Sequence, residues 1–303
     1  MLAFDLRKQK ESKVMSTETI ASSHPLASLR AWEPVAKPTW YRDQDGQLRN
    51  TEGVSKVVFR DDSGEAIGSI GAKAGIVSNA AKCDLFESLE QRGVLSNLSC
   101  GEFRGGARVW LRGKSKANSF ELMPGHEIEH NLFLVDGYGG DIGLLPADTA
   151  IDYSCENMIA TLSKQKSTQK LRHTGKISER FAALVQQIHQ SVTEFEKTKH
   201  ALQHLTRQKA QFSDLREMLD KFFPLPVGEA TERKVANVQE TRNRVAHAYE
   251  HAPGAVPGTR YGLYQAATYW LTHERGRNGS RFEQNITGEG ARLNRAFLSH
   301  TLN

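Results

Sequence analysis

Hydrophobic and polar positions follow two different patterns along this chain of 303 residues, and the change falls near residue 177. Over residues 55–152 the apolar residues come in short β-prone runs broken by turns, as in SKVVFR and AIGSIG on either side of a turn at 62–64. From Ile177 onward they recur every three or four residues, which is the period of an amphipathic helix. The pattern predicts an α+β protein whose antiparallel β-rich N-terminal half, with one short helix, precedes a helical C-terminal half.

Capping residues and breakers place the expected helices. The short helix lies in SNAAKCDLFESLEQRG, with Ser78 or Asn79 as its N-cap and Gly93 after its end. SCENMIATL, after Asp152, returns to helical spacing. The C-terminal half is expected to hold a long helix or an antiparallel helix pair over 177–222, a helix over about 231–249, and an aromatic-rich helix in TRYGLYQAATYWLTHE.

These patterns divide the chain into three parts. Residues 1–30 are polar and without a sustained apolar period, so we expect a flexible tail. Residues 31–176 form the expected β-rich domain, and residues 177–303 form a helical region that packs on it or extends from it.

The composition indicates the cellular compartment in which we expect the protein. No apolar run approaches the roughly 20 residues that cross a bilayer, and no secretion signal is recognisable, so we expect no membrane partner. The three cysteines, Cys83, Cys100 and Cys155, lack the spacing of a disulfide framework or a zinc site, which favours a reducing cytoplasm.

Charge is distributed unevenly between the halves. Residues 1–159 hold 18 basic and 22 acidic residues, a balance of −4, whereas residues 160–303 hold 22 and 13, a balance of +9. Clustered lysine and arginine attract polyanions, so the basic half points to a nucleic-acid partner. The alternative is that these charges only solvate helix faces.

The segment LSKQKSTQKLRHTGKISERF, which joins the two halves, is the most basic stretch of the chain. It has no acidic residue before Glu179, and its side chains include hydroxyls and amides that can bond phosphate oxygens. We take its cationic residues as candidate nucleic-acid contacts: Lys164, Lys166, Lys170, Arg172, His173, Lys176 and Arg180.

The run ARVWLRGK has the alternation of a strand. Val109 and Leu111 face one side, so Arg108, Trp110 and Arg112 face the other and complete the candidate site. A tryptophan between two arginines suits single strands, because cations follow the phosphates and the ring stacks on unpaired bases. Trp110 could equally be a partly buried anchor of the sheet. The hypothesis is a protein without enzymatic activity or cofactor that binds single-stranded DNA and self-associates along it.

HEIEH at 126–130 matches the H-E-x-x-H signature of zinc hydrolases, with His126, Glu127 and His130 in the required order. That chemistry needs a helix, which brings the two histidines to one metal ion. Here the flanks indicate a turn leading into a strand, where the histidines would lie about 13 Å apart at roughly 3.3 Å per residue. A zinc hydrolase therefore stays a remote alternative, and we predict no metal site and no catalytic residues.

Six segments in order resemble the domain-of-unknown-function family 932, the phage/plasmid-like protein family: DSGEAIGSIGAKAGIVSNAAKCDLFESLE, GARVWLRGK, NLFLVDGYGG, CENMIATL, LRHTGKISERF and GTRYGLYQAATYWLTHERGR. The resemblance covers roughly residues 55–300 and implies a phage or plasmid setting, with replication or recombination proteins as partners. By layout, a β-rich half feeding a basic connector and helices is similar to phage single-strand annealing proteins. A competing hypothesis is a protein-interaction factor of a mobile element that uses the helices over 177–275 as its contact surface.

Overall fold

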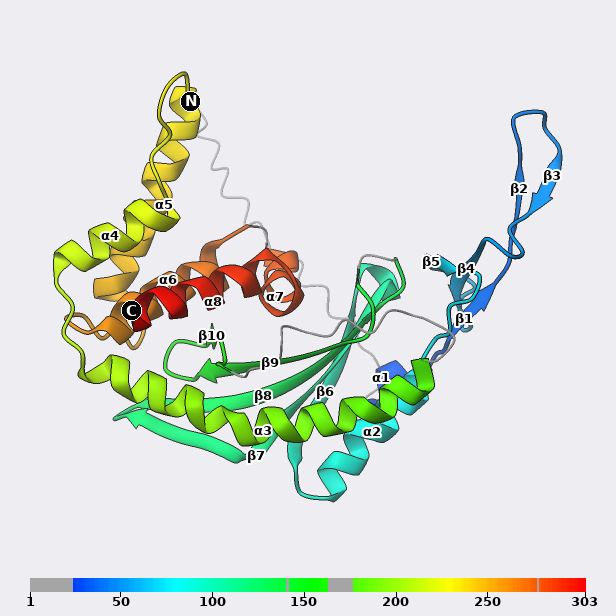
Figure 1. The fold of residues 1–303 in the computed structure, drawn as a ribbon, viewed down its shortest axis with the longest axis horizontal. Coiled ribbons are helices and arrows are strands. Elements are labelled where there is room, and N and C mark those ends of the chain that lie inside the picture. The colour runs from blue at the N-terminus through cyan, green and yellow to red at the C-terminus, as the bar shows by residue number, and fades with distance from the viewer. Residues whose placement is uncertain (1–23, 140–141, 163–176, 277) are drawn as a thin grey trace, which may run out of the picture.

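The computed structural model describes residues 24–139, 142–162, 177–276 and 278–303. Strands fill its N-terminal half and helices its C-terminal half, which confirms the predicted α+β order (Figure 1). The strands are β1 (Pro34–Lys37), β2 (Trp40–Arg42), β3 (Leu48–Asn50), β4 (Ser55–Arg60), β5 (Ala66–Gly71), β6 (Leu95–Phe103), β7 (Arg108–Met123), β8 (His126–Gly137), β9 (Leu145–Asp152) and β10 (Asn157–Ile159). The helices are α1 (Ala27–Arg30), α2 (Asn79–Gln91), α3 (Ile177–Arg207), α4 (Phe212–Phe222), α5 (Glu232–His251), α6 (Arg260–Tyr269), α7 (Asn278–Thr287) and α8 (Glu289–Leu302), with a π-helical turn at Trp270–Glu274 and a 3₁₀ turn at Arg104–Gly106.

A five-stranded antiparallel sheet in the order β10-β9-β8-β7-β6 forms the centre of the molecule. Alternation along β7 sends Val109 and Leu111 to one face and Trp110 to the other, as the sequence predicts. The first face packs against α2 and α3, and the second face packs against α7 through Phe282 and Ile286. The sheet is therefore covered by helices on both sides over much of its length.

A second, three-stranded sheet of order β1-β4-β5 precedes the central sheet, and the two-stranded ribbon β2-β3 projects from it. Gly68 of β5 passes so close to the end of β8 that a Cβ there would lie 2.2 Å from the carbonyl oxygen of Tyr138. Only glycine permits that approach, which fixes the small sheet on the central one. In Figure 1 the ribbon and the α4–α5 pair stand out at opposite ends of the long axis.

Helix α3 is a single 31-residue helix, which decides between the long helix and the helix pair that the sequence allows. Leu184 and Ile188 pack into the core formed with α2 and the central sheet. Further along, Phe195 and Leu202 belong to a second core with β8, β9 and helices α4, α5, α6 and α8. The two halves therefore share their cores through α3.

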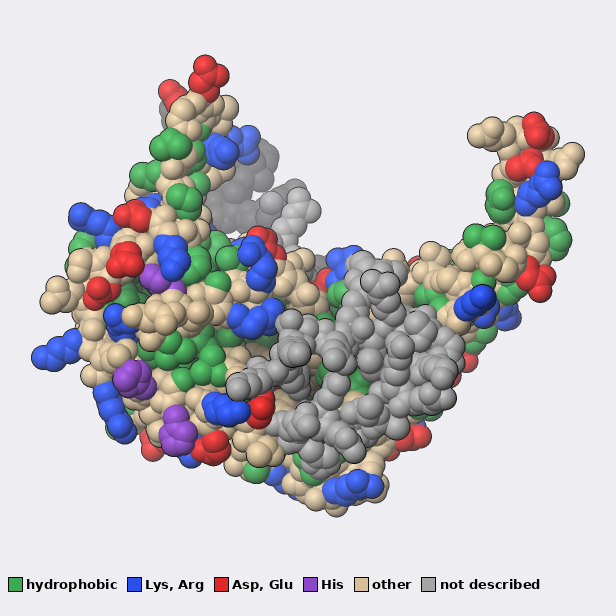
Figure 2. All heavy atoms as spheres, in the orientation of Figure 1, with side chains coloured by type: hydrophobic (Ala, Val, Ile, Leu, Met, Phe, Trp, Pro, Cys, Tyr) green, Lys and Arg blue, Asp and Glu red, His purple; other side chains and the backbone are tan. Residues whose placement is uncertain are grey.

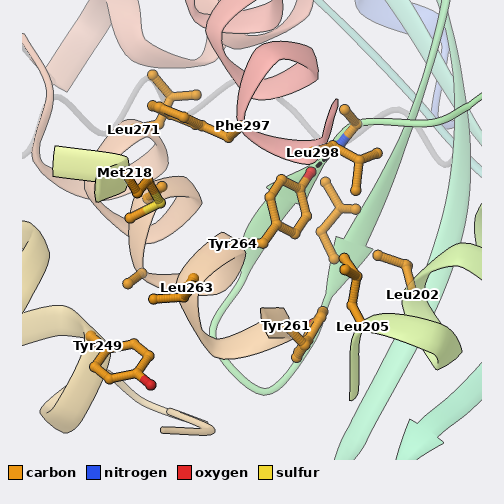
Figure 3. Close-up of a cluster of buried hydrophobic side chains, with 14 of the residues drawn as sticks. Leu202, Leu205, Met218, Tyr249, Tyr261, Leu263, Tyr264, Leu271, Phe297 and Leu298 are labelled. Atoms are coloured by element: carbon orange, nitrogen blue, oxygen red, sulfur yellow. Dashed lines mark hydrogen bonds between the residues drawn. The ribbon is translucent and has the colours of Figure 1, made fainter. Parts of the chain in front are cut away.

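The second core is rich in tyrosine and leucine side chains that converge from the helices, as Figure 3 shows for Tyr261, Leu263 and Tyr264 of α6. The hydroxyl of Tyr264 accepts a hydrogen bond from the backbone N–H of Ala160, 2.8 Å away, at the end of β10. Tyr249 belongs to the same core. These residues therefore pack the helices against the sheet.

Three local expectations need correction. SCENMIATL does not return to a helix: Asn157–Ile159 form β10, because β9 offers a free edge on which they pair. Residues 24–30 of the expected tail are ordered, since Leu26 and Leu29 are buried in the core with α2. The strand expected at HEIEH is confirmed, but β8 already begins at His126, so the histidines are buried in the strand and not exposed in a turn.

Ser78 caps α2 by accepting a hydrogen bond from the N–H of Ala81 at 3.1 Å, as expected. Gly93, with a φ of 73°, follows the end of the helix. All three cysteines are free thiols. Within the described part of the chain, no helix combines the length and apolar character that crossing a bilayer requires.

Candidate nucleic-acid interface

Of the predicted contacts on β7, one is buried and one is packed in an aromatic cluster. Arg108 is 8% exposed and forms an ion pair with Glu283 of α7. The ring of Trp110 meets Phe282 of α7 edge-on, with centroids 5.2 Å apart, and also packs near Phe133 of β8. The expectation of an exposed contact is therefore wrong for Arg108, and of the two interpretations of Trp110 the partly buried anchor is the one observed, because α7 covers this face of the sheet.

Arg112 is half-buried and keeps a polar environment. Its Nε donates to Oδ1 of Asn131 on β8 at 2.8 Å. The next cation on the same face of β7 is Lys114, and Glu129 forms an ion pair with it. Unlike Arg108, Arg112 is therefore partly accessible and forms no ion pair with a carboxylate among the described residues.

The basic connector lies outside the described residues: Lys164, Lys166, Lys170, Arg172, His173 and Lys176. Arg180 falls in the first turn of α3, but its side chain also lies outside the description. Their role as nucleic-acid contacts stays a prediction from the sequence.

A different group of cations, which we call the cation cluster, lies on the segments where α3 ends and α4, α6 and α8 meet: Arg207, Lys209, Lys221 and Arg260, with His300 among them. Lys209 forms a β-bridge with Thr259, the residue before Arg260. Nη1 of Arg260 donates to the carbonyl oxygen of Thr301 at 3.2 Å. The Nζ of Lys221 donates to Nδ1 of His300 at 3.1 Å, and His300 is the residue before Thr301.

The electrostatics of the cluster are those of an anion site. Arg207, Lys209 and Lys221 are exposed, and no described carboxylate forms an ion pair with any of them. Burial lowers the pKa of His300, and the positive charges of Lys221 and Arg260 lower it further, against an opposing effect of Glu217. Figure 2 shows several Lys and Arg side chains over the helical part of this face, with Asp and Glu side chains between some of them.

The ribbon β2-β3 presents a second group of candidate contacts, which combines arginines with exposed aromatic rings. Trp40 is 63% exposed and Tyr41 is 53% exposed. Arg42 and Arg49 lie on the same two strands and are also exposed. Exposed aromatic rings next to guanidinium groups are typical of surfaces that bind unpaired bases.

The HEIEH histidines are committed to separate partners on the face of β8 that carries Ile128. Nδ1 of His126 lies 2.9 Å from Oδ2 of Asp152. Nε2 of His130 lies 3.5 Å from Oδ2 of Asp148, and its ring stacks on Phe195 with centroids 4.1 Å apart. Over the residues that the structure describes, no group of three or more His, Cys, Asp or Glu side chains could hold a metal ion.

Ser154, His126 and Asp152 are in contact, but not as a catalytic triad. Oγ of Ser154 lies 3.0 Å from Nδ1 of His126, the nitrogen that also contacts Asp152. A triad needs the carboxylate on one ring nitrogen and the nucleophile on the other. The backbone of Gly254 also lies close to this group, since a Cβ at that position would lie 2.3 Å from Oγ of Ser154. The arrangement therefore joins loops and strands and gives no activated nucleophile.

An open hollow of about 570 Å³ next to Ser154 is acidic. Glu121 and Glu127 line it, and the lining residues include no lysine or arginine among those described. Carboxylates repel phosphate groups, so this hollow does not belong to a nucleic-acid surface.

Comparison with known proteins gives one finding. The family model described as "Domain of unknown function (DUF932)" matches residues 66–298, about three quarters of the chain. The chain belongs to the DUF932 family. No curated protein and no solved structure matches it.

In this DUF932 protein the match runs from β5 to α8 and so includes the lysines and arginines of the cation cluster, but neither His300 nor the ribbon. Sequence reasoning missed both features. The cluster is assembled from α3, α4, α6 and α8, so no local run of letters marks it. The ribbon had a signal: Asp45-Gly46 lies between WYR and LRN, and an Asp-Gly pair between β-prone residues favours a hairpin.

Proposed function

We propose that this protein binds single-stranded nucleic acid, specifically DNA, in the annealing, recombination or replication of a phage or plasmid. The observation that carries the proposal is the cation cluster, where exposed Arg207, Lys209 and Lys221 form no ion pair with a described carboxylate. Surface cations of most proteins alternate with acids. Cations without such ion pairs favour a polyanionic ligand, because phosphates release their counterions on binding.

The charge of the whole chain supports the same partner. The basic half carries a balance of +9, and the connector that joins the halves supplies five of its lysines and arginines: Lys164, Lys166, Lys170, Arg172 and Lys176. The layout of a β-rich half, a basic connector and a long helix is similar to that of phage single-strand annealing proteins. That similarity favours a role in recombination, in the reducing cytoplasm and with several copies along one strand, and it is an analogy of layout.

The first test is a titration of a fluorescent 40-nucleotide oligothymidylate at rising salt concentrations. If about five cations meet phosphates, the logarithm of the association constant should fall with the logarithm of the salt concentration with a slope near −3.5. No binding at low salt would end the proposal.

Two charge variants then locate the contacts, one in the connector (K164E/K166E/K170E/R172E) and one in the cation cluster (R207E/K209E/K221E). Each should weaken binding at least about 10-fold at moderate salt and reduce the slope, because fewer counterions are released. The matched control is K197E/R244E/R292E, which changes charge as much as the cluster variant does but alters cations already paired with Glu194, Glu240 and Glu289. If the control weakens binding as much as the cluster variant, the effect is one of net charge and the cluster is not a site.

A protein-interaction role is the second candidate, and the α4–α5 arm is the observation that favours it. Phe212 is 64% exposed, Leu225 is 44% exposed and Val227 is 94% exposed, so apolar side chains recur along the arm. We expect tagged protein to capture phage or plasmid replication or recombination proteins from plasmid-bearing cells, and F212S/L225S/V227S to lose them. Capture that survives these changes would remove the arm as a contact surface.

A further inference from the structure

The ribbon β2-β3 is built so that both of its faces are available. The register pairs Tyr41 with Arg49 and Arg42 with Leu48. Residues directly opposite each other in an antiparallel pair share a face, and neighbours along a strand point to opposite faces. One face therefore carries Trp40, Arg42 and Leu48, and the other carries Tyr41 and Arg49.

Both faces thus hold one exposed aromatic ring with an arginine beside it. On the first face, Trp40 and Arg42 are two residues apart on β2. On the second face, Tyr41 lies opposite Arg49, whose side chain is 57% exposed. A surface for docking a folded protein would gather its apolar groups on one side with polar groups at the rim. The ribbon instead divides its rings between two sides.

The two strands of the ribbon are joined to each other at its base. The N–H of Thr51 donates to the carbonyl oxygen of Thr39 at 2.8 Å, and the N–H of Thr39 donates to Oγ1 of Thr51 at 2.9 Å. Beyond this pair the two strands extend away from the core. A two-stranded hairpin is too small to form a core of its own. Large aromatic side chains are usually at least partly buried, whereas the rings on this ribbon are exposed.

The cations on the strands at and below the ribbon also suit an anionic ligand. Arg42 and Arg49 lie on β2 and β3, Lys37 and Lys56 lie on the adjoining strands β1 and β4 of the small sheet, and Asp43, Asp45 and Glu52 lie in the turns. Asp43 is already engaged, because it accepts hydrogen bonds from the N–H groups of Asp45 and Gln47 and forms an ion pair with Arg49 at 2.8 Å. Arg42 donates to the carbonyl oxygen of Gly46 at 2.9 Å, which leaves its charge without a carboxylate among the described residues.

We propose that the ribbon is a base-stacking element, on which Trp40 and Tyr41 stack against unpaired bases while Arg42 and Lys37 contact the phosphates of the same strand. This inference rests on the proposed function and adds the chemistry that selects single strands, since a stack needs a base that is not already paired. The ribbon and the cation cluster lie at opposite ends of the long axis, so a strand that contacts both follows the length of the protein (Figure 1).

The test compares the full-length chain with W40A/Y41A on two ligands, the 40-nucleotide oligothymidylate and a duplex of the same length. The variant should bind the single strand at least about 30-fold more weakly, because it loses two stacks that contribute roughly 1–3 kcal/mol each. Its affinity for the duplex should not change. The control Y153A removes an aromatic side chain that is 47% exposed beside the acidic hollow, away from both proposed contact surfaces, and it should bind both ligands like wild type.

Intrinsic fluorescence gives a readout that a loss of folding cannot imitate. Of the four tryptophans, Trp32 is buried, Trp110 and Trp270 are half-buried, and Trp40 is exposed. Unlabelled oligothymidylate should quench the emission of wild type, since stacking on a base quenches an indole ring. W40F, which keeps a ring at that position, should retain most of the affinity but lose most of the quenching.

The outcomes separate this inference from the proposed function. If wild type binds oligonucleotides with the expected salt dependence but W40A/Y41A binds the single strand equally well, the ribbon is not a stacking element and the proposed function stands. If W40A/Y41A instead lowers the mass of the protein measured by light scattering, with affinity unchanged, the ribbon docks a second copy of the chain and the inference is wrong. If wild type binds no oligonucleotide, both proposals fail.

Discussion

Replacing Lys82 by methionine is expected to lower the free energy of unfolding by about 3–5 kcal/mol, the cost of leaving one charge of a buried pair without its partner. Lys82 of α2 has no exposed surface, and its Nζ lies 2.7 Å from Oδ2 of Asp136, at the end of β8. The same ammonium donates to Oδ1 of Asn79 at 3.0 Å and to the hydroxyl of Tyr138 at 2.8 Å. All three of its protons are therefore used, and the substitution removes three hydrogen bonds with the charge.

The position of this pair explains the size of the effect. It joins the first turns of α2 to the end of the central strand, next to the close approach of Gly68 and Tyr138. Burial and the charge of Asp136 hold the pKa of Tyr138 well above its ordinary value, so the phenol keeps its proton. The measurement is urea denaturation at pH 7 followed by circular dichroism.

Two further variants make the result interpretable. K73M changes an exposed lysine and should shift stability by no more than about 0.5 kcal/mol. K82M/D136L removes both charges and should be more stable than the sum of its two single variants predicts, because neither charge is then left alone. A K82M protein as stable as K73M would show that the pair contributes little to the fold.

Local patterns predicted those features of the fold that depend on neighbouring residues. The period of two in β7 places Val109 and Leu111 on the α2 and α3 face, and the three-residue and four-residue spacing after Ile177 gives α3. These follow from the sequence because a strand or helix fixes which side chains share a face.

Which face is open to solvent depends on residues far away in the chain, and local patterns do not contain it. Arg108 has the spacing of an exposed strand residue, yet its partner Glu283 is 175 residues away. His126 and His130 match a metal motif, yet Asp152 and Asp148 come from the next strand and bind them separately. Candidate sites predicted from short motifs were therefore wrong where a later element buries the residues or supplies other partners for them. The cation cluster was not predicted because its residues come from four helices and form no motif.

Replacing Asp152 by asparagine is expected to lower the free energy of unfolding by about 2–3 kcal/mol, because hydrogen bonds to a charged group contribute roughly 1.5–3 kcal/mol each. The buried carboxylate accepts from the hydroxyl of Tyr261 on α6 at 2.6 Å and from the hydroxyl of Ser154 at 2.7 Å, and His126 lies 2.9 Å away. It therefore links the sheet to the helical half. An amide at this position keeps the shape but places N–H groups where an acceptor is needed.

The same carboxylate gives the stability a pH dependence with a defined sign. Burial alone would raise the pKa of Asp152, but the hydrogen bonds from His126, Tyr261 and Ser154 outweigh it and hold the pKa below its ordinary value. A carboxyl whose pKa is lower in the folded state than in the unfolded chain stabilises the fold above the unfolded value of about 3.9. That contribution is lost as the pH falls below about 4 and the folded carboxylate takes up a proton.

Unfolding in urea at pH values from 6 to 3 should therefore show a smaller loss of stability for D152N than for wild type. The remaining slope comes from other carboxyls with lowered pKa values, among them Asp148, where burial is outweighed by hydrogen bonds from His130 and Ser191. D220N is the matched control, because Asp220 is 62% exposed and pairs with Arg242 at the surface. If D152N and wild type lose stability in parallel while D152N is destabilised at pH 6, Asp152 acts through shape and hydrogen bonding alone, and its charge does not help to join the sheet to α6.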